Sequence, residues 1–156
     1  MAILNLRFAS CVMFALMMGG LVGCATGPGG VRTPSESTAG RSLADCPARP
    51  SCVSSQDAAS LHRIAPLKFE GDAAAALQRV RDILKGMQRT KIVADDDHYV
   101  HATQATAIFH FTDDVEFLLD AKNSEIQVRS CARFGFYDFG VNRRRIEAIR
   151  LALSQR

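Results

Sequence analysis

The sequence predicts an α+β fold in which an antiparallel four-strand meander sheet is packed by two helices. The chain has 156 residues, 47% of them apolar and 22% charged, which suits one domain with a core. Apolar residues recur at helical spacing over residues 72–86 and again over 142–154. Between these two segments apolar and polar residues alternate, as they do in half-buried strands. The expected order is therefore helix, four strands, helix.

A positively charged start and a short apolar run predict that the chain begins with a secretory signal over residues 1–23. Arg7 is the one charged residue of this segment, and an apolar run follows it, which is the order of a signal peptide. The last residues, LVGC at 21–24, resemble the lipobox of bacterial lipoproteins. The resemblance implies cleavage after Gly23, transfer of a lipid to the Cys24 thiol and acylation of the new amino terminus.

We therefore predict a lipid-anchored protein of the bacterial cell envelope. Ala25 follows the cysteine, whereas Asp at that place favours the inner membrane in bacteria, so the periplasmic face of the outer membrane is expected. Two alternatives stay open: a signal peptide without lipid, and a transmembrane anchor over residues 8–31. The glycines and the proline of residues 26–30 leave such a span shorter than the roughly 20 residues that a membrane helix needs.

The segment that follows predicts a flexible linker. Residues 25–44 read ATGPGGVRTPSESTAGRSLA, which is rich in Gly, Pro, Ser and Thr and has no apolar period. Such a composition is typical of a tether. We therefore expect the lipidated cysteine and linker to occupy residues 24–44, and a single domain without internal repeats to occupy residues 45–156.

Three cysteines remain for the domain, and an oxidising envelope favours disulfides. Cys46 and Cys52 enclose the segment CPARPSC, whose two prolines restrict the backbone. We predict a disulfide between them. Free thiols stay an alternative, and a zinc site is weakly supported because no second cysteine pair follows at the usual spacing. Cys131 is left over and fits a small buried apolar residue better than a nucleophile.

The first helix and the first hairpin follow from local signals. Asp72 is a good N-cap and Gly86 marks the end of the helix, because a side-chain oxygen caps helix starts and glycine favours helix ends. The residues on the buried face are Ala73, Ala76, Leu77, Val80, Ile83, Leu84 and Met87. Residues 91–94 and 99–102 flank the sequence DDDH, which predicts a hairpin with an acidic turn.

Two further strands and a helix complete the predicted domain. The strands cover residues 107–119 and 126–132, and residues 120–124 turn the chain between them. The residues expected on the buried faces are Ala107, Phe109, Phe111, Val115, Phe117 and Leu119, then Ile126, Val128, Ser130 and Ala132. The turn near residues 104–106 is poorly marked, so one long bent strand is an alternative. The final helix carries Ile146, Ile149 and Leu153 inward.

Acidic and basic residues are segregated along the chain. Residues 95–125 hold eight acids against Lys122, and residues 129–156 hold seven arginines against two acids. The two halves meet in an antiparallel hairpin, so we expect mutual neutralisation, with Arg129 opposite Glu116 or Asp114 according to the register. The candidate salt-bridge or anion cluster is Asp113, Asp114, Glu116, Arg129, Arg133, Asp138, Arg143 and Arg145.

Two parts of this cluster conflict with local preferences. Asp113 falls on the strand face assigned to the core, where an unpaired carboxylate is costly. Asn142 is expected to cap the last helix, yet Arg143 and Arg145 occupy its first turn, where the helix dipole disfavours cations. We predict that one of these arginines, or Arg133, hydrogen-bonds to this carboxylate or to its neighbour. The alternative is a small anion site at the helix start.

Four segments after residue 45 carry a family resemblance. They are CPARPSCVSSQ at 46–56, IAPL at 64–67, FTDDVEF at 111–117 and RSCARFGFYDFGVNRRRIEAIR at 129–150. They resemble the bacterial and plastid family known as domain of unknown function 1499, and the last segment is the most specific. Cys131 departs from the Ala or Ser that is usual at its place. The family has no established activity, so the resemblance implies no catalytic residues.

Several classes of function lack support in the sequence. Motifs for nucleotide binding and for serine hydrolases are absent. His98 and His101 lie close to the acidic turn, but this spacing puts them on opposite faces of a strand, so we predict no metal site and no cofactor. A net charge of +3 and a pI near 8.7 do not indicate a nucleic-acid partner.

Two hypotheses of function remain. The first is a membrane-anchored lipoprotein whose non-enzymatic domain binds or supports an envelope protein, with the lipid on Cys24 as its membrane attachment. The second is a hydrolase or transferase that uses Asp113, Asp114 and Glu116 together with the neighbouring arginines. A deep pocket lined by these groups would favour the enzyme, whereas mutual salt bridges would favour the binding protein.

Overall fold

A computed structural model describes residues 35–37, 40–106 and 111–155. The predicted signal segment, the predicted lipidation site at Cys24 and residues 107–110, which were predicted to begin a strand, lie outside the described residues. The helices are α1 (Ala73–Gly86) and α2 (Val141–Ser154). The strands are β1 (Ser35–Ser37), β2 (Gly40–Ser42), β3 (Cys52–Ser54), β4 (Leu67–Lys68), β5 (Thr90–Asp95), β6 (Tyr99–Ala105), β7 (Thr112–Asp120) and β8 (Glu125–Ala132).

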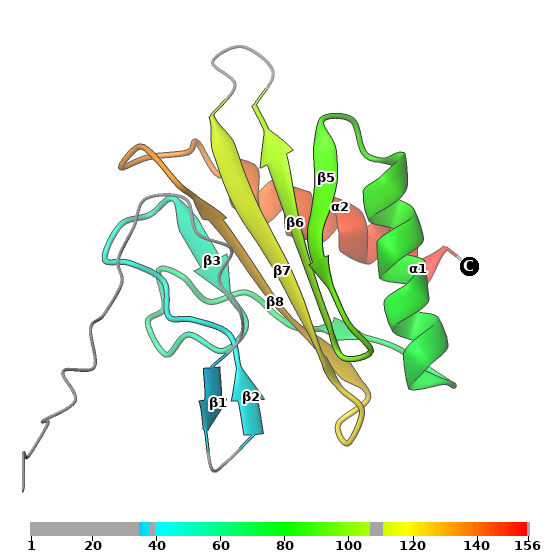
Figure 1. Cartoon of the computed structure of the whole chain (residues 1–156). Helices are drawn as coiled ribbons and strands as arrows, with labels where there is room; N and C mark the ends of the chain where they lie inside the picture. The colour runs from blue at the N-terminus through cyan, green and yellow to red at the C-terminus, as the bar shows by residue number, and fades with distance from the viewer. Residues whose placement is uncertain (1–34, 38–39, 107–110, 156) are drawn as a thin grey trace, which may run out of the picture.

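The main sheet confirms the predicted α+β class and the antiparallel meander. Strands β5, β6, β7 and β8 follow one another in the sheet, and both helices lie on the same face of it (Figure 1). The sheet has six strands rather than the four expected, because β3 and β4 both pair with the outer edge of β8. They have three and two residues, too few to show an alternating pattern in the sequence.

The core between the sheet and the helices contains the predicted apolar faces. Helix α1 begins after Asp72, whose side chain accepts a 2.7 Å hydrogen bond from the Ala75 N–H, as expected of an N-cap. The buried residues include Ala76, Leu77, Val80, Leu84, Val115, Phe117, Ile126, Val128, Ile146, Ile149 and Leu153. Phe111 is a correction, since it precedes β7 and is 49% exposed.

The start of α2 also differs from the prediction. Asn142 is not the cap but the second residue of the helix, and it is fully buried. The Asp138 carboxylate takes the capping role, because it accepts hydrogen bonds from the Gly140 and Asn142 N–H groups at 2.9 and 2.8 Å. A negative charge before the first turn interacts favourably with the helix dipole, whereas the arginines that follow interact unfavourably with it.

The second face of the sheet is covered by the chain that precedes β3. Leu43 is buried there against Tyr99 and Leu118, and Arg41 lies over the Tyr99 ring at 5.6 Å. Strands β1 and β2 pair within the segment expected to be a linker. None of the helices in the described part of the chain is long and apolar enough to cross a membrane.

Candidate functional site

Six of the eight predicted cluster residues fall into two groups of ion pairs on opposite faces of the sheet. Successive side chains of a strand point to opposite faces, so Asp113 faces the helices whereas Asp114 and Glu116 face away from them. The observed register pairs Glu116 with Arg129 across β7 and β8, which is one of the two alternatives predicted. We call the two groups the helix-side cluster and the outer cluster.

The helix-side cluster joins α2 to the middle of the sheet. Arg145 donates from Nη2 to Asp113 Oδ2 at 2.6 Å and from Nη1 to Ser130 Oγ at 2.8 Å. The same Nη1 reaches Asn142 Oδ1 at 2.6 Å, and Nε donates to the Gln104 side chain. The Arg145 and Asp113 side chains are each only 4% exposed. The predicted contact between Asp113 and an arginine of this turn is therefore confirmed.

Arg143 lies outside the cluster, contrary to the prediction that included it. Its Nη2 donates to the Arg63 backbone oxygen at 2.9 Å, and the side chain is exposed. Asp138 contacts Asn142 twice, through the N–H and through Nδ2 at 2.9 Å. Among the described residues Asp138 caps α2 and pairs with no arginine, so it connects the helix start to the cluster through Asn142.

The outer cluster is built around Glu116, whose side chain is 2% exposed. Arg129 Nη1 donates to Glu116 Oε2 at 2.6 Å, and the Tyr99 hydroxyl donates to Glu116 Oε1 at 2.8 Å. Burial, followed by the Glu116 charge, raises the pKa of the Tyr99 hydroxyl well above its usual value, so Tyr99 stays a donor. Each oxygen of the buried carboxylate therefore has a partner.

Asp114 forms the second half of the outer cluster. Arg133 donates from Nε to Oδ2 at 3.0 Å and from Nη2 to Oδ1 at 2.8 Å. His101 Nε2 lies 2.8 Å from Asp114 Oδ1, and its Nδ1 is buried without a partner among the described residues. The Nε2–H group of His101 can donate to the Asp114 carboxylate in this arrangement.

The electrostatics of Asp114 predict a measurable acid sensitivity. Burial acts to raise its pKa, but the hydrogen bonds from His101 and Arg133 outweigh burial and lower the pKa to about 2. A carboxyl whose pKa is lower in the folded state stabilises the fold above its unfolded pKa of about 3.9 and loses that effect as the pH falls further. We expect Asp114→Asn to lower the free energy of unfolding by about 1–2 kcal/mol at pH 7.

Urea unfolding between about pH 2 and pH 7 tests this expectation. The difference between the parent and Asp114→Asn should shrink as the pH falls from about 4 towards 2, because the parent carboxyl then binds a proton too. Asp82→Asn is the matched control, since Asp82 is exposed and its side chain has one hydrogen-bond partner among the described residues, Gln78 at 3.0 Å. A difference that stays constant over this range would contradict the assigned contacts.

Tyr99, His101, Gln104 and Ser130 complete the two clusters, although we did not predict them as site residues. Three of them lie on β6, which pairs with the β7 residues of the clusters in register. The alternation of YVHATQ over residues 99–104 could have indicated this, because it puts Tyr99 and His101 on one face. Ser130 was predicted to lie on the buried face, but no partner was predicted for its hydroxyl. The structure shows that this hydroxyl contacts Arg145 and Asn142.

The predicted disulfide joins Cys46 to Cys52, with their Cα atoms 5.7 Å apart. The disulfide closes the loop that leads from the segment after β2 into β3. Arg49 in this loop donates to the Ala132 backbone oxygen, and Ser51 Oγ donates to the Gly135 oxygen at 3.1 Å. Cys131 is a free and buried thiol, which agrees with the expectation that it fits a buried position.

An exposed aromatic segment, residues 134–139, is the feature that the sequence analysis did not assign. It lies between β8 and α2 and reads FGFYDF. The exposed fractions are 63% for Phe134, 71% for Phe136, 61% for Tyr137 and 78% for Phe139. Four large aromatic residues among six, without helical or alternating period, were the signal in the sequence. Apolar groups gathered in this way on a surface are typical of interaction sites.

The aromatic segment is held in place from both ends. Gly135 and Gly140 adopt φ angles of 89° and 75°, which residues with side chains rarely adopt. Arg144 Nη1 donates to the Phe139 oxygen at 2.8 Å. The Tyr137 and Phe139 rings meet edge to face, with their centroids 5.1 Å apart. The backbone that carries the aromatic side chains is therefore held by two glycine turns and by the hydrogen bond from Arg144.

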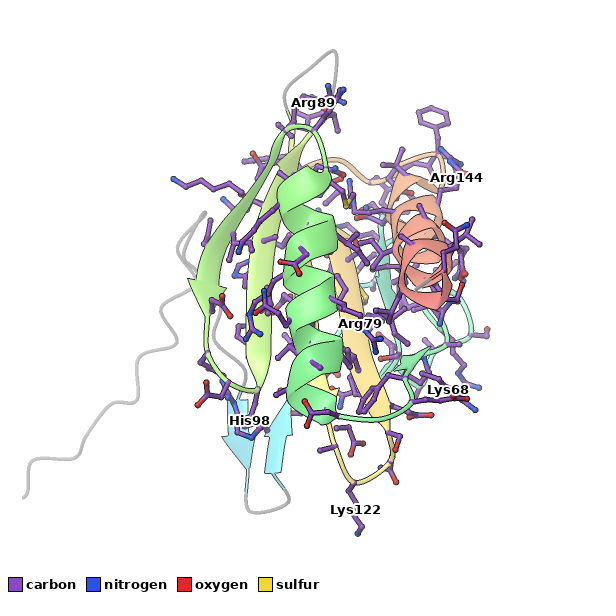
Figure 2. All side chains as sticks on the ribbon, turned by 90° about the vertical axis from the view of Figure 1, so that its right-hand side faces the viewer. Lys68, Arg79, Arg89, His98, Lys122 and Arg144 are labelled. Carbon is purple, nitrogen blue, oxygen red and sulfur yellow. A yellow bond between two sulfur atoms is a disulfide. The ribbon has the colours of Figure 1, made fainter. Side chains whose placement is uncertain are left out.

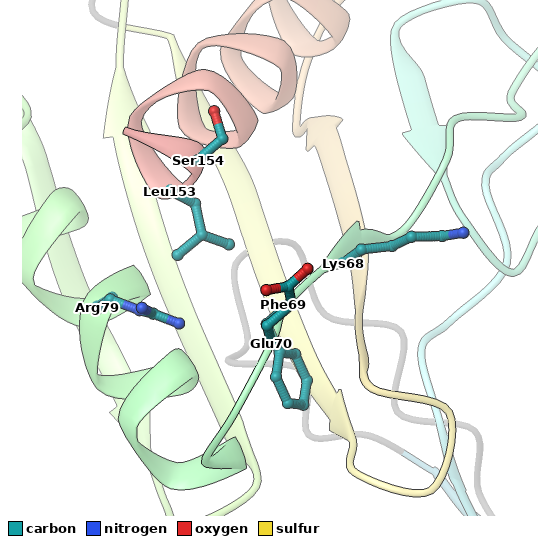
Figure 3. Close-up of a pocket in the computed structure, with 6 residues that line it drawn as sticks. All are labelled: Lys68, Phe69, Glu70, Arg79, Leu153 and Ser154. Carbon is teal, nitrogen blue, oxygen red and sulfur yellow. The ribbon is translucent and has the colours of Figure 1, made fainter. Parts of the chain in front are cut away.

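The described residues also form an open hollow of about 340 Å³ beside the end of α2. Figure 3 shows its lining residues, which are Lys68, Phe69, Glu70, Arg79, Leu153 and Ser154. No residue of the two charged clusters lines it. Within the part of the chain that the structure describes, no three His, Cys, Asp or Glu side chains are arranged to hold a metal ion.

Comparison with known proteins agrees with the resemblance seen in the sequence. The family model described as "Protein of unknown function (DUF1499)" matches residues 42–153. The chain belongs to this family. The match covers the elements from β3 to α2 except Ser154, the last residue of α2, and hence both charged clusters and the aromatic segment. No curated protein and no solved structure matches the chain.

Proposed function

We propose that this DUF1499 protein is a lipid-anchored envelope protein whose domain binds another envelope protein through the aromatic segment and catalyses no reaction. The exposure of Phe134, Phe136, Tyr137 and Phe139 is the observation that carries the binding part. The signal segment and Cys24 support the anchor and the periplasmic face of the outer membrane. The partner supplies an apolar patch for the aromatic rings.

The contacts of the acids favour binding over the hydrolase or transferase alternative. General acid–base catalysis needs a carboxyl group within hydrogen-bond reach of the substrate. Both oxygens of Asp114 and both oxygens of Glu116 already accept hydrogen bonds from side chains of the same domain. Asp113 is buried beneath α2 and paired with Arg145. The acids are thus engaged in holding the fold together.

The distribution of charge indicates the chemistry of the partner. Arg89 and Arg144 lie at the end of the domain that carries the aromatic segment, and His98 and Lys122 lie at the other end (Figure 2). Both arginines are exposed, and the N-terminus of α2 adds positive potential there. The exposed acids of residues 95–97 lie at the opposite end. The surface therefore fits an apolar partner patch with an acidic rim.

The position of the amino-terminal hairpin favours a protein over the anchoring membrane as the partner. Arg41 of β2 pairs with Asp96 at 2.9 Å, which ties the hairpin to the end remote from the aromatic segment (Figure 1). The lipid on Cys24 precedes this hairpin in the chain. The lipid anchor is thus attached through the end of the domain that carries the hairpin. In this arrangement the aromatic segment, at the other end, faces away from the anchoring membrane.

Site-specific photo-crosslinking in intact cells tests the binding surface. We expect a photoreactive residue at Phe136 to give one discrete protein adduct, and the same probe at Lys122 to give none. Phe134→Ser together with Phe139→Ser should lower the adduct yield roughly tenfold or more, because exposed aromatic anchors dominate interface energies. A crosslink to phospholipid or to a second copy of the chain at Phe136 would contradict the proposed partner, as would an equal adduct from Lys122.

The anchor is tested separately by labelling with a radioactive fatty acid. Cys24→Ser should abolish the label, because the thiol is the acceptor of the lipid. Cys11→Ser is the matched control, since Cys11 lies in the expected signal segment and its loss should leave the label on the mature chain unchanged. Undiminished label on Cys24→Ser would refute lipidation at Cys24. It would not affect the crosslinking test of the binding surface.

A further inference from the structure

Cys52 and Cys131 occupy facing positions of the antiparallel strands β3 and β8. Along the same ladder, the Ala132 N–H donates to the Ser51 oxygen and the Ser55 N–H donates to the Val128 oxygen, each at 2.9 Å. Hydrogen-bonded and non-hydrogen-bonded pairs alternate along such a ladder, so Cys52 and Cys131 form a non-hydrogen-bonded pair with Cα atoms about 4.5 Å apart. Disulfides span Cα distances of about 4.4–6.8 Å, and this pair lies within that range.

The same Cys52 already belongs to the disulfide with Cys46. Both partners of the facing pair are buried, with exposed fractions of 0% for Cys52 and 5% for Cys131. Their side chains lie on the same face of the sheet, because directly paired residues of neighbouring strands share a face. The free thiol of Cys131 is therefore held beside the sulfur of an existing disulfide.

We propose that Cys131 can replace Cys46 as the disulfide partner of Cys52. The domain then has two disulfide isomers, Cys46–Cys52 and Cys52–Cys131. The Cys131 thiolate attacks Cys52 Sγ, the Cys52–Cys131 bond forms, and the Cys46–Cys52 bond breaks. Cys46 leaves as a thiolate and takes up the proton that Cys131 has lost. Two thiol–disulfide states of equal oxidation level interconvert, and the step needs no external oxidant or reductant.

The environment of Cys131 sets the rate of this exchange. Burial raises the pKa of the Cys131 thiol, while the nearby guanidinium groups of Arg129 and Arg49 act in the opposite direction. Only the thiolate attacks a disulfide. The exchange is therefore slow near neutral pH and becomes faster as the pH rises towards the pKa of the thiol.

The exchange changes what supports the aromatic segment. In the Cys46–Cys52 isomer the closed loop holds Arg49 and Ser51 against the backbone of Ala132 and Gly135. The Cys52–Cys131 isomer opens that loop and ties β3 directly to β8. The isomers thus differ at the base of the segment proposed to bind the partner. The exchange itself stands on the strand register and is independent of any binding function.

Mass mapping of the non-reduced full chain tests the proposal. The protein is incubated at about pH 6 or pH 8, trapped with acid before unfolding, alkylated and digested with trypsin. Trypsin does not cleave between Arg49 and Pro50, so residues 42–63 form one peptide with both Cys46 and Cys52, and residues 130–133 form a second one. We expect a cross-linked species of these two peptides with alkylated Cys46, formed roughly a hundredfold faster at pH 8 than at pH 6.

Two variants sharpen the result. Cys46→Ser, treated with oxidised glutathione, should form the Cys52–Cys131 disulfide without the native partner. Cys52→Ser is the matched control and should leave Cys46 and Cys131 unlinked, because they are not paired in the sheet. If the parent shows only internally linked 42–63 peptide and alkylated Cys131 at both pH values, exchange does not occur. Free thiols or glutathione adducts at Cys52 and Cys131 in Cys46→Ser would overturn the proposal in the same way.

Discussion

Asp113→Asn and Arg145→Gln are each expected to lower the free energy of unfolding by about 3–5 kcal/mol, because each leaves an uncompensated charge in the interior. The two side chains are each 4% exposed and meet at 2.6 Å. Arg145 also donates to Ser130, Asn142 and Gln104. Its loss removes donors from four acceptors that water does not reach freely, and an unsatisfied buried group adds to the cost.

Urea unfolding of both single variants and of the double variant measures this effect. The double variant should be destabilised by far less than the sum of the singles, since its second substitution removes the charge that the first left unpaired. Arg143→Gln is the matched control, because Arg143 is in the same helical turn but exposed. Its effect should stay below about 1 kcal/mol. Additive single effects, or an equal effect of Arg143→Gln, would show that this contact does not hold α2 to the sheet.

The sequence predicts that Asp113 needs a partner but not which arginine supplies it. The alternation of β7 puts Asp113 beside Val115 and Phe117, and that pattern is readable without a structure. Arg143 and Arg145 lie about 160° apart around the helix, given about 3.6 residues per turn, on either side of the apolar stripe. Which of them reaches the sheet depends on how α2 lies across β8, and the sequence does not carry that information.

The long elements were predictable because each has an apolar period of its own. Helix α1 carries the period over 14 residues. The meander follows from strands of six to nine residues, with marked turns at residues 95–98 and 120–124. Strand β3 has no such period and exists because Ser51–Ser55 meets the edge of β8. The outer cluster was only partly predictable for the same reason, since Tyr99 and His101 join it through pairing of β6 with β7.

Removal of the arginine that pairs with Glu116 in the outer cluster is the second substitution expected to cause a large loss of stability, and this loss should depend on pH. Arg129→Met should lower the free energy of unfolding by about 3–5 kcal/mol at pH 7, because Glu116 then stays buried without its countercharge. A carboxyl left in this state has its pKa raised in the fold above the value in the unfolded chain. The folded variant then binds a proton more readily than the unfolded chain, so its stability should rise as the pH falls from 7 towards about 4.5.

Unfolding of Arg129→Met, Glu116→Gln and the double variant across this pH range separates charge from packing. The double variant should recover part of the loss at pH 7 and show no rise in stability at lower pH, because the Glu116 carboxyl that would bind the proton is gone. Tyr99→Phe is a graded comparison, since it removes one donor to Glu116 and should cost about 1 kcal/mol. If Arg129→Met has the same pH dependence as the parent, Glu116 reaches water in the variant and the pair does not act as a buried one. A loss of 3–5 kcal/mol that is relieved by acid would instead show that Arg129 is kept in the sheet as the countercharge of Glu116.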